Sequence, residues 1–320
     1  MNRRRYEWRL KDRTLLLGER TLIMGILNVT PDSFSDGGRY DDADRAFARA
    51  VELEEAGADL IDIGAESTRP GAERITEAEE MRRLIPILRR LRDKLSIPIS
   101  VDTYKSTVAE KALDLGVEIV NDPSLLTFDP LLARTVGQHN AGLILNHMRG
   151  TPETWAKLPP MHDAIHTIAA DLDAGVHRAV RAGVDRARIV VDPGLGFGKR
   201  GEQNSEILAH LSALGSLDLP VLVGPSRKGF LSQWHKAPEV CPFDLMTAAA
   251  VTAAILNGAH IVRVHEVREL KAVVHLADQI LGFSAVEEST GAPAGRGQAG
   301  GSAPRRPRVG PPRDTRGERR

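Results

Sequence analysis

The feature that most constrains this chain is a regular alternation of short apolar runs and amphipathic segments between residues 21 and 281. Eight runs rich in β-branched residues are typical of buried strands: Thr21–Leu27, Asp59–Ile63, Pro98–Val101, Val117–Val120, Gly142–Leu145, Arg188–Val191, Pro220–Val223 and Ala259–Val264. Eight segments have helical spacing: Asp44–Glu55, Glu77–Leu95, Lys105–Leu115, Pro130–His139, Ala164–Arg181, Ser205–Leu214, Leu245–Leu256 and Glu269–Leu281. Because strands that alternate with helices form parallel sheets, and eight repeats close the sheet, we predict a (β/α)8 TIM barrel.

Glycine marks the joints from helix to strand. Gly57, Gly116, Gly183 and Gly258 each stand where a left-handed helix cap is expected. The joints from strand to helix are longer and more polar, which agrees with a barrel whose active site lies at the C-terminal strand ends. An open doubly wound sheet is the alternative, but the first strand is not followed by a G-x-G-x-x-G turn.

The periodic region predicts a single domain over residues 20–284, preceded by an N-terminal extension over 1–19. Residues 285–320 are expected to form a disordered tail, since Gly291–Arg320 holds seven Gly and five Pro, with Val309 its only large aliphatic residue. Eight Arg in that stretch against Asp314 and Glu318 leave the rest of this formally neutral chain at about −6. A disordered extension is favoured over a tail for an anionic partner, and we expect no nucleic-acid partner.

Cysteine use and hydropathy indicate the compartment. Cys241 is the single cysteine, so no intrachain disulfide is possible, and a reducing environment fits. The Arg-rich start, Met1–Arg13, is not followed by the apolar run of a signal peptide. No window approaches the roughly 20 apolar residues of a membrane span. We therefore expect a cytoplasmic protein with no membrane association.

The first two long joints carry polar groups suited to anions and cations. Asn28 falls at a strand end, where its amide is placed to meet a hard cation or a phosphate oxygen, although a cap or turn role is as good an explanation. The second joint brings Thr68 and Arg69 into a loop shaped by Gly and Pro. Arg69 offers a planar fork for phosphate or carboxylate, and the alternative is a salt bridge with Glu66 or a neighbouring glutamate.

Hydrogen-bond acceptors follow three further strands. Asp102, Asn121 and Asp192 stand at the ends of the third, fourth and sixth predicted strands, and a barrel brings these ends together. Carboxylates facing one interior repel each other unless a donor-rich ligand supplies hydrogen bonds. The donor edge of a pterin ring is such a ligand. A single Asp of this kind is often only a helix cap, whereas three in series favour a binding site.

Later joints add cations and a histidine. Gly194–Lys199 lacks the spacing of a P-loop, so Phe197 is interpreted as a packing wall. Lys228 is placed to reach a ring heteroatom and to keep Asp192 ionised, with surface solvation as the alternative. Arg263 and His265 alternate onto the same strand face, one to stack on a flat heterocycle and one to donate to a leaving pyrophosphate. No His or Cys cluster indicates a structural zinc site.

Eight segments together resemble dihydropteroate synthases, in the same order and over about residues 20–282: MGILNVTPDSFSDGG, DIGAESTRPG, ISVDTYKSTVAEKAL, NDPSL, HMRGTPETW, DPGLGFGK, GPSRKGFL and RVHEV. The resemblance implies an alkyl transferase of folate biosynthesis. Such an enzyme joins (7,8-dihydropterin-6-yl)methyl diphosphate to 4-aminobenzoate and releases 7,8-dihydropteroate and pyrophosphate, without a protein nucleophile. It also implies Mg2+ as cofactor and a homodimer.

The resemblance also implies residue roles. The pterin ring would be bound by Asp102, Asn121, Asp192 and Lys228, with Met148 and Phe197 as neighbours and Arg263 stacked on the ring. The diphosphate and its Mg2+ would be held by Asn28, Thr68, Arg69, Arg263 and His265, with Asn28 as the metal ligand. The 4-aminobenzoate pocket would be formed by Phe34, Pro70, Ser226 and Lys228. Asp102, Lys228, Arg263 and His265 would be the catalytic set.

Some positions depart from the usual pattern of that family. Ala65, Pro123 and Asn146 replace its usual residues, while Pro225 and Gly229 flank Ser226–Lys228. Because Pro and Gly change loop stiffness beside the aminobenzoate pocket, we hypothesise a reduced sensitivity to sulfonamides.

Two other functions fit part of the pattern. A pterin-dependent methyltransferase would also place Asp and Asn at strand ends, but it has no need for the Ser67–Pro70 and Arg263–His265 diphosphate groups. A non-catalytic pterin-binding paralogue would keep the ring site and lose the anion site. Both sets of residues are present here, which favours the synthase.

Overall fold

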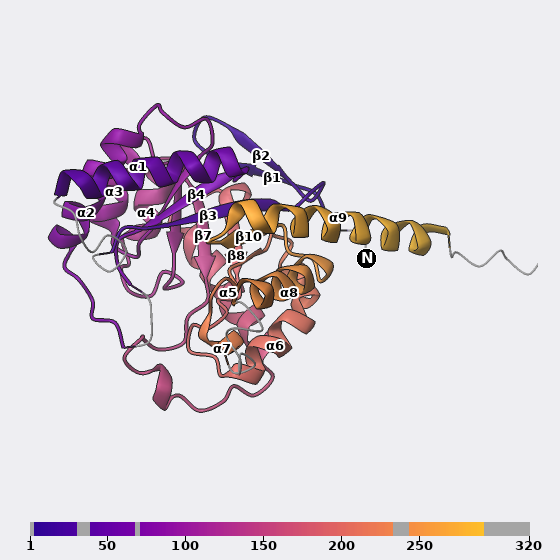
Figure 1. Cartoon of the computed structure of the whole chain (residues 1–320). Coiled ribbons are helices and arrows are strands. Elements are labelled where there is room, and N and C mark those ends of the chain that lie inside the picture. Colours follow the sequence, from indigo (N-terminus) through magenta and orange to yellow (C-terminus); the bar gives the residue numbers. More distant parts are fainter. Residues whose placement is uncertain (1–2, 31–38, 68–70, 233–242, 291–320) are drawn as a thin grey trace, which may run out of the picture.

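The eight expected strands form a closed barrel. In the computed structural model, which describes residues 3–30, 39–67, 71–232 and 243–290, parallel strands are hydrogen-bonded in the order β8-β7-β6-β5-β4-β3-β10-β9. A parallel bridge between Val191 and Val221 joins the two ends of this order. Helices surround the strands (Figure 1). The prediction of a (β/α)8 barrel is confirmed.

Each strand overlaps a predicted run. The strands are β3 (Leu22–Asn28), β4 (Leu60–Gly64), β5 (Ile99–Asp102), β6 (Ile119–Asp122), β7 (Gly142–Asn146), β8 (Ile189–Asp192), β9 (Leu222–Val223) and β10 (Ile261–Val264). The helices are α1 (Arg39–Ala56), α2 (Glu77–Leu91), α3 (Ser106–Asp114), α4 (Leu132–Gln138), α5 (Ala164–Arg181), α6 (Gly201–Ala209), α7 (Gly229–Ser232), α8 (Phe243–Leu256) and α9 (Val267–Thr290). Every residue of β4 is buried, as expected for a parallel strand covered on both faces.

Local chemistry explains where the helices begin and end. At the start of α2, the Thr76 hydroxyl accepts a hydrogen bond from the backbone N–H of Glu79 at 3.2 Å, which satisfies one free helix donor. Gly57, Gly116, Gly183 and Gly258 have φ of +100°, +99°, +101° and +102°, so the four predicted left-handed caps are confirmed.

Some boundaries differ from prediction. Helix α6 ends at Ala209 and is followed by 3-10 turns over Leu211–Leu217, and the short helix α7 was not predicted. Helix α9 runs to Thr290 rather than Leu281 and extends beyond the barrel (Figure 1). Residues 285–290, assigned to the tail from sequence, are therefore helical, because this stretch contains good helix formers and no Gly or Pro. Residues 291–320 lie outside the described residues.

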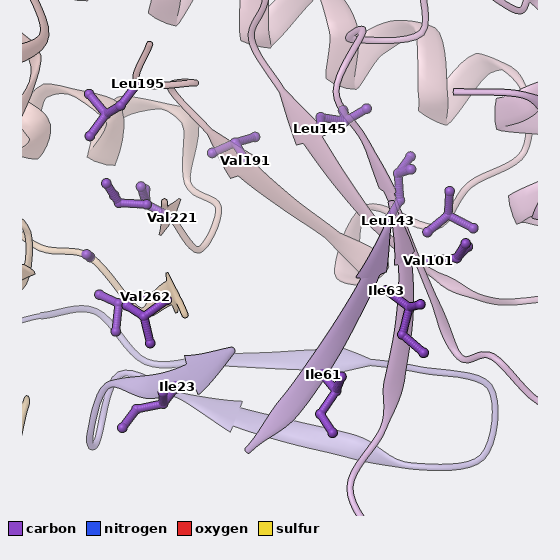
Figure 2. Packing of buried hydrophobic residues seen from close by; sticks show 14 of the residues in the cluster. Ile23, Ile61, Ile63, Val101, Leu143, Leu145, Val191, Leu195, Val221 and Val262 are labelled. Atoms are coloured by element: carbon purple, nitrogen blue, oxygen red, sulfur yellow. The ribbon is translucent and has the colours of Figure 1, made fainter. Parts of the chain in front are cut away.

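Two apolar clusters lie on opposite sides of the barrel wall. The larger cluster fills the space between strands and helices; Figure 2 shows some of its side chains, including Ile61, Ile63, Val101 and Leu143. The smaller cluster fills the barrel interior near the N-terminal strand ends: Leu22, Met24, Leu60, Ile119, Ile144, Val190, Leu222 and Ile261. The interior is therefore packed at one end, which leaves the C-terminal end for polar groups.

The N-terminal extension is a β-hairpin that seals the packed end. Strands β1 (Tyr6–Arg9) and β2 (Thr14–Leu17) pair antiparallel. Trp8 and Leu17 are fully buried within the smaller cluster, and the Trp8 indole N–H donates to the Arg188 carbonyl at 2.9 Å. A segment interpreted from sequence only as an extension thus belongs to the core. No helix in the described ranges is long and apolar enough to cross a membrane.

Candidate active site

A cavity of about 940 Å³ opens at the C-terminal ends of the barrel strands. Its lining comes from β3, β5 and β10, from the loops that follow β4, β7, β8 and β9, and from helices α1, α6 and α7. Seven predicted site residues contribute to this lining: Asn28, Asp102, Phe197, Ser226, Lys228, Arg263 and His265. The cavity therefore gathers residues that lie far apart in sequence at the end of the barrel where such sites form.

Arg263 organises a group of charged and polar side chains at the base of this cavity, hereafter called the floor: Asp62, Asp102, Asn121 and Arg263 itself. Its Nε donates to Asp62 Oδ2 at 2.6 Å, and its Nη2 donates to Asp102 Oδ2 at 3.1 Å. Asn121 Nδ2 also donates to Asp62 Oδ2, at 3.0 Å. One planar guanidinium thus bridges two carboxylates from neighbouring strands and fixes their orientation.

Asp62 is the main member of the site that was not predicted from the sequence. Its side chain is fully buried, and its Oδ1 has no hydrogen-bond partner among the described residues. The signal was available, since alternation along β4 turns Asp62 to the same face as Leu60, which lies in the interior cluster. A charged residue in the middle of an otherwise apolar strand is costly unless it is paired, and Arg263 is its counter-ion.

Burial and neighbouring charges shift the pKa values of Asp102 and Arg263. Burial, and secondly the neighbouring Asp62, raise the pKa of Asp102 to about 7, against the opposing pull of Arg263 and Lys228. Burial alone would lower the pKa of Arg263, but Asp62 and Asp102 outweigh it and raise that pKa. The guanidinium therefore stays charged, while Asp102 gains or loses its proton near neutral pH.

Asp192 and Lys228 form a second charged group. Burial raises the pKa of Asp192 to about 6, even though its Oδ1 accepts a hydrogen bond from the Gly194 N–H at 2.7 Å. Burial, followed by repulsion from Arg263, lowers the pKa of Lys228 to about 8. The Lys228 ammonium lies 4.0 Å from the centre of the Phe197 ring, and both side chains line the cavity.

The backbone between Asp192 and Phe197 needs glycine. Gly194 has φ of +67°, and a Cβ there would come within 2.0 Å of the His147 carbonyl oxygen. Lys199 Nζ donates to both the Gly194 and His147 carbonyls at 2.7 Å. The buried Lys199 therefore ties the β7 and β8 loops together, which agrees with the rejection of a phosphate-binding P-loop.

His265 is held by Ser226. The Ser226 hydroxyl lies 2.9 Å from His265 Nδ1, and it accepts the backbone N–H of His265 at 3.2 Å. Burial, together with the positive charges of Arg263, Arg227 and Lys228, lowers the pKa of His265 to about 3. The imidazole is therefore neutral at physiological pH.

A buried ion cluster supports the loop after β4. Lys105 Nζ donates to both Glu66 and Glu80, and the Tyr104 hydroxyl donates to Glu66 Oε1 at 2.9 Å. Among the parts of the chain that the structure describes, Glu66 therefore accepts hydrogen bonds from Lys105, Tyr104 and the backbone N–H of Ile75. Arg69, weighed as its partner from sequence, lies outside those parts.

The remaining predicted residues are placed less directly. Asn121 and Asp192 are each 7% exposed and do not line the cavity surface, so they belong to its buried support. Met148 is partly buried after β7 and is also absent from the lining. Phe34, Thr68, Arg69 and Pro70 lie outside the described residues.

Several lining residues were not singled out from sequence. Arg49, Thr30, Glu66, Trp155, Lys199 and Glu266 all contribute to the cavity. Arg49 Nη2 donates to the His265 carbonyl at 2.9 Å, so it fixes the end of β10. An arginine in the middle of an amphipathic helix gives no sequence signal for such a role, because exposed arginines are common there.

Within residues 3–30, 39–67, 71–232 and 243–290, no group of three or more His, Cys, Asp or Glu side chains is arranged to hold a metal ion. Asn28 ends β3 at the cavity wall. A magnesium ion commonly takes only one or two protein oxygens and completes its shell with water and substrate phosphates. A single amide at this mouth is therefore compatible with a metal that arrives together with a diphosphate.

Comparison with known proteins agrees with this geometry. Residues 24–265 match the family described as pterin binding enzyme. The dihydropteroate synthase of Synechocystis sp. is 44% identical over 263 residues, covering 82% of this chain and 91% of that protein. A structure of Xanthomonas albilineans dihydropteroate synthase with 4-aminobenzoic acid has a TM-score of 0.78 at 35% identity, covering 91% of this chain and 100% of that one. A structure of the Yersinia pestis dihydropteroate synthase with a sulfonamide drug has a TM-score of 0.78 at 35% identity. The match covers 86% of this chain and 99% of that one.

Proposed function

This chain belongs to the pterin-binding enzymes and, within them, to the dihydropteroate synthases, and on that premise we propose how its site performs the reaction. The enzyme is an alkyl transferase that condenses (7,8-dihydropterin-6-yl)methyl diphosphate with 4-aminobenzoate. The observation that carries the residue assignment is the meeting of Asp102, Lys228, Arg263 and His265 in one cavity of about 940 Å³. An acid, two cations and a neutral imidazole lie together there, which suits a flat ring with a donor edge and an anionic tail.

The floor is proposed to bind and orient the pterin. Ionised Asp102 and Asp192 are proposed as acceptors for ring N–H groups, with Asn121 and Lys228 completing the pattern of donors and acceptors. Because Asp192 and Asn121 lie behind the cavity lining, this proposal requires the edge of the ring to reach past the lining residues. Arg263 is already fixed by Asp62 and Asp102, so its guanidinium is preorganised for stacking against the ring. Fixed dipoles and charges of this kind need no reorganisation during the reaction.

The bond changes need no protein nucleophile. The arylamine nitrogen forms a bond to the methylene carbon, the bond from that carbon to the diphosphate oxygen breaks with its electron pair, and the amine releases a proton. The electron-rich pterin stabilises positive charge on the methylene, while His265 donates to the departing pyrophosphate. Thr68 and Arg69 are proposed to bind the same anion.

Asn28 is proposed as the protein ligand of Mg2+. Its support is its place at the end of β3 on the cavity wall, together with the preference of Mg2+ for oxygen ligands and substrate phosphates. The bound ion would neutralise negative charge on the diphosphate.

The 4-aminobenzoate is proposed to bind nearer the mouth, beside Lys228 and the Ser226 loop, with Phe34 and Pro70 completing the pocket. Pro225 and Gly229 flank that loop, and Arg227 within it has a left-handed φ of +53°. Because Pro225 stiffens this loop, Gly229 loosens it and Arg227 holds a strained conformation, we propose that sulfonamides, which compete for the aminobenzoate site, bind less well than to a susceptible synthase.

The decisive assay measures pyrophosphate release from the dihydropterin methyl diphosphate with Mg2+, in the presence and absence of 4-aminobenzoate. Turnover that requires 4-aminobenzoate is expected. Pterin binding without turnover would instead indicate a non-catalytic paralogue. Titration with a sulfonamide in the same assay tests the second proposal, which an inhibition constant equal to that of a susceptible synthase would contradict.

The pH profile should follow the buried acids and Lys228. We expect kcat/KM to rise between about pH 6 and 7, as Asp192 and Asp102 ionise with pKa values of about 6 and 7, and to fall above about pH 8, where Lys228 has its pKa. Replacing Asp192 with Asn should lower kcat/KM and remove the part of the pH dependence of kcat/KM that is centred near pH 6.

The free energy of unfolding should fall with rising pH, whereas kcat/KM rises. The folded pKa of Asp192, about 6, exceeds its unfolded value of 3.8. Between these two pH values the folded state binds more protons than the unfolded state, so the folded state loses stability as the pH rises from 3.8 to about 6. Urea unfolding should therefore show that Asp192→Asn has a higher free energy of unfolding than the parent protein at pH 8. The difference between the two proteins should be smaller at pH 4. An unchanged pH dependence would contradict the assignment.

Assembly and location remain proposals of the same kind. Helices α8 and α9 pack together and carry Leu245, Leu276 and Phe283, which are 59%, 58% and 76% exposed. Apolar groups of this size favour burial against a second copy, and we propose a homodimer through these helices, to be tested by sedimentation equilibrium. The lone Cys241 supports a cytoplasmic location.

A further inference from the structure

The Ser226 hydroxyl occupies a position between two nitrogens of one residue. It lies 3.2 Å from the backbone nitrogen of His265 and 2.9 Å from Nδ1 of the same side chain. Ser226 follows β9 and His265 follows β10, and the two strands are neighbours in the barrel. Ser226 is only 4% exposed, so water competes poorly for these contacts.

The direction of both hydrogen bonds follows from the available protons. The backbone N–H of His265 is a donor only, so Ser226 Oγ must accept there. The hydroxyl has one proton, and Nδ1 is the only acceptor for it among residues 3–30, 39–67, 71–232 and 243–290. Were Nδ1 protonated instead, that hydroxyl proton would be buried without an acceptor, which costs about 1–3 kcal/mol.

The charges around His265 support the neutral ring. Arg263, Arg227 and Lys228 face it, and Asp244 is the opposing acid, while Glu266 is already engaged by Arg227 and Arg49. A neutral ring whose Nδ1 accepts a hydrogen bond must carry its proton on Nε2. Nε2 has no partner among the described residues and is not sealed off from the cavity that His265 lines.

We propose that Ser226 is a positioning residue that locks His265 in the Nε2–H tautomer, so that this nitrogen is always a donor toward the leaving diphosphate. The inference rests on the proposed synthase function and deepens it. It also changes the part assigned to Ser226, because a hydroxyl that donates to Nδ1 has no proton left for the carboxylate of 4-aminobenzoate. Ser226 therefore acts on the leaving-group end of the reaction.

The tautomer is measured directly by 15N NMR of the full chain with labelled histidine, with His265→Gln used to assign the signal. In the parent protein, His265 should show a proton on Nε2 and an unprotonated, hydrogen-bonded Nδ1. Ser226→Ala should give a mixture of tautomers, whereas Ser226→Thr, which keeps the hydroxyl, should restore the parent spectrum. A protonated Nδ1 in the parent, or an unchanged spectrum in Ser226→Ala, would overturn the proposal.

Kinetics separates this role from direct substrate binding. Ser226→Ala should lower kcat about tenfold with little change in KM for 4-aminobenzoate, a smaller loss than removal of a whole oxyanion donor because part of the population keeps the productive tautomer. A raised KM for 4-aminobenzoate at unchanged kcat would mean that the hydroxyl contacts that substrate instead. Failure of the parent protein to release pyrophosphate would count against the synthase function, while the NMR result still decides the tautomer.

Discussion

Replacing Arg263 with Met is expected to lower kcat/KM by about 10³-fold, because removal of one partner from a buried, hydrogen-bonded charge pair costs roughly 2–5 kcal/mol. Arg263 is the shared donor of Asp62 and Asp102, whose side chains are 0% and 18% exposed. Without it, two carboxylates face each other over the floor, one of them takes up a proton, and the acceptor pattern for the pterin is lost. Steady-state kinetics with varied dihydropterin substrate measures the loss.

Two controls sharpen this result. Arg263→Lys keeps a charge but cannot donate from a planar fork to both acids, so it should recover only part of the activity. Arg20 forms a comparable arginine–aspartate pair with Asp59, but its side chain is 55% exposed and precedes β3 at the opposite end of the barrel. Arg20→Gln should therefore change kcat/KM less than about twofold. Full activity in Arg263→Met would refute the assigned floor.

Replacing Lys105 with Met is expected to destabilise the fold by about 3–5 kcal/mol, since it removes the counter-ion of two buried acids. The Lys105, Glu66 and Glu80 side chains are 9%, 11% and 1% exposed. Burial already raises the pKa of Glu80 while Lys105 is present. At this chain length such a loss corresponds to a melting temperature about 10 °C lower, measurable by circular dichroism.

A control on α2, the helix that carries Glu80, tests whether burial is the cause. Arg82 pairs with Glu79 on the exposed face of α2, and Arg82→Met should leave the melting temperature unchanged within error. Combining Glu80→Gln with Lys105→Met should recover part of the stability, because one of the two uncompensated buried charges, that of Glu80, is then gone while Glu66 remains. Equal melting temperatures for Lys105→Met and the parent protein would contradict a stabilising role for this cluster.

The barrel was predictable because its information is local. Runs such as Asp59–Ile63 and caps such as Gly57 depend on a few consecutive residues, and the structure confirms them as β4 and a left-handed helix end. Once eight strands alternate with eight helices, strand-end residues such as Asp102 and Arg263 must meet at one mouth. Their presence in one cavity therefore needed no knowledge of tertiary contacts.

Contacts between side chains distant in sequence required the folded chain. Trp8 reads as part of a polar extension, yet it plugs the barrel and donates to Arg188, 180 residues away. The bridging of Asp62 by Arg263 and the lock of Ser226 on His265 span 201 and 39 residues. The sequence by itself determined the order of elements and the residue types at the mouth, since hydrophobic period and turn chemistry act over short range. Only the tertiary structure decided which acid pairs with which base and which nitrogen of His265 is placed to accept from Ser226. Both depend on burial and on distances of a few ångströms between separate strands.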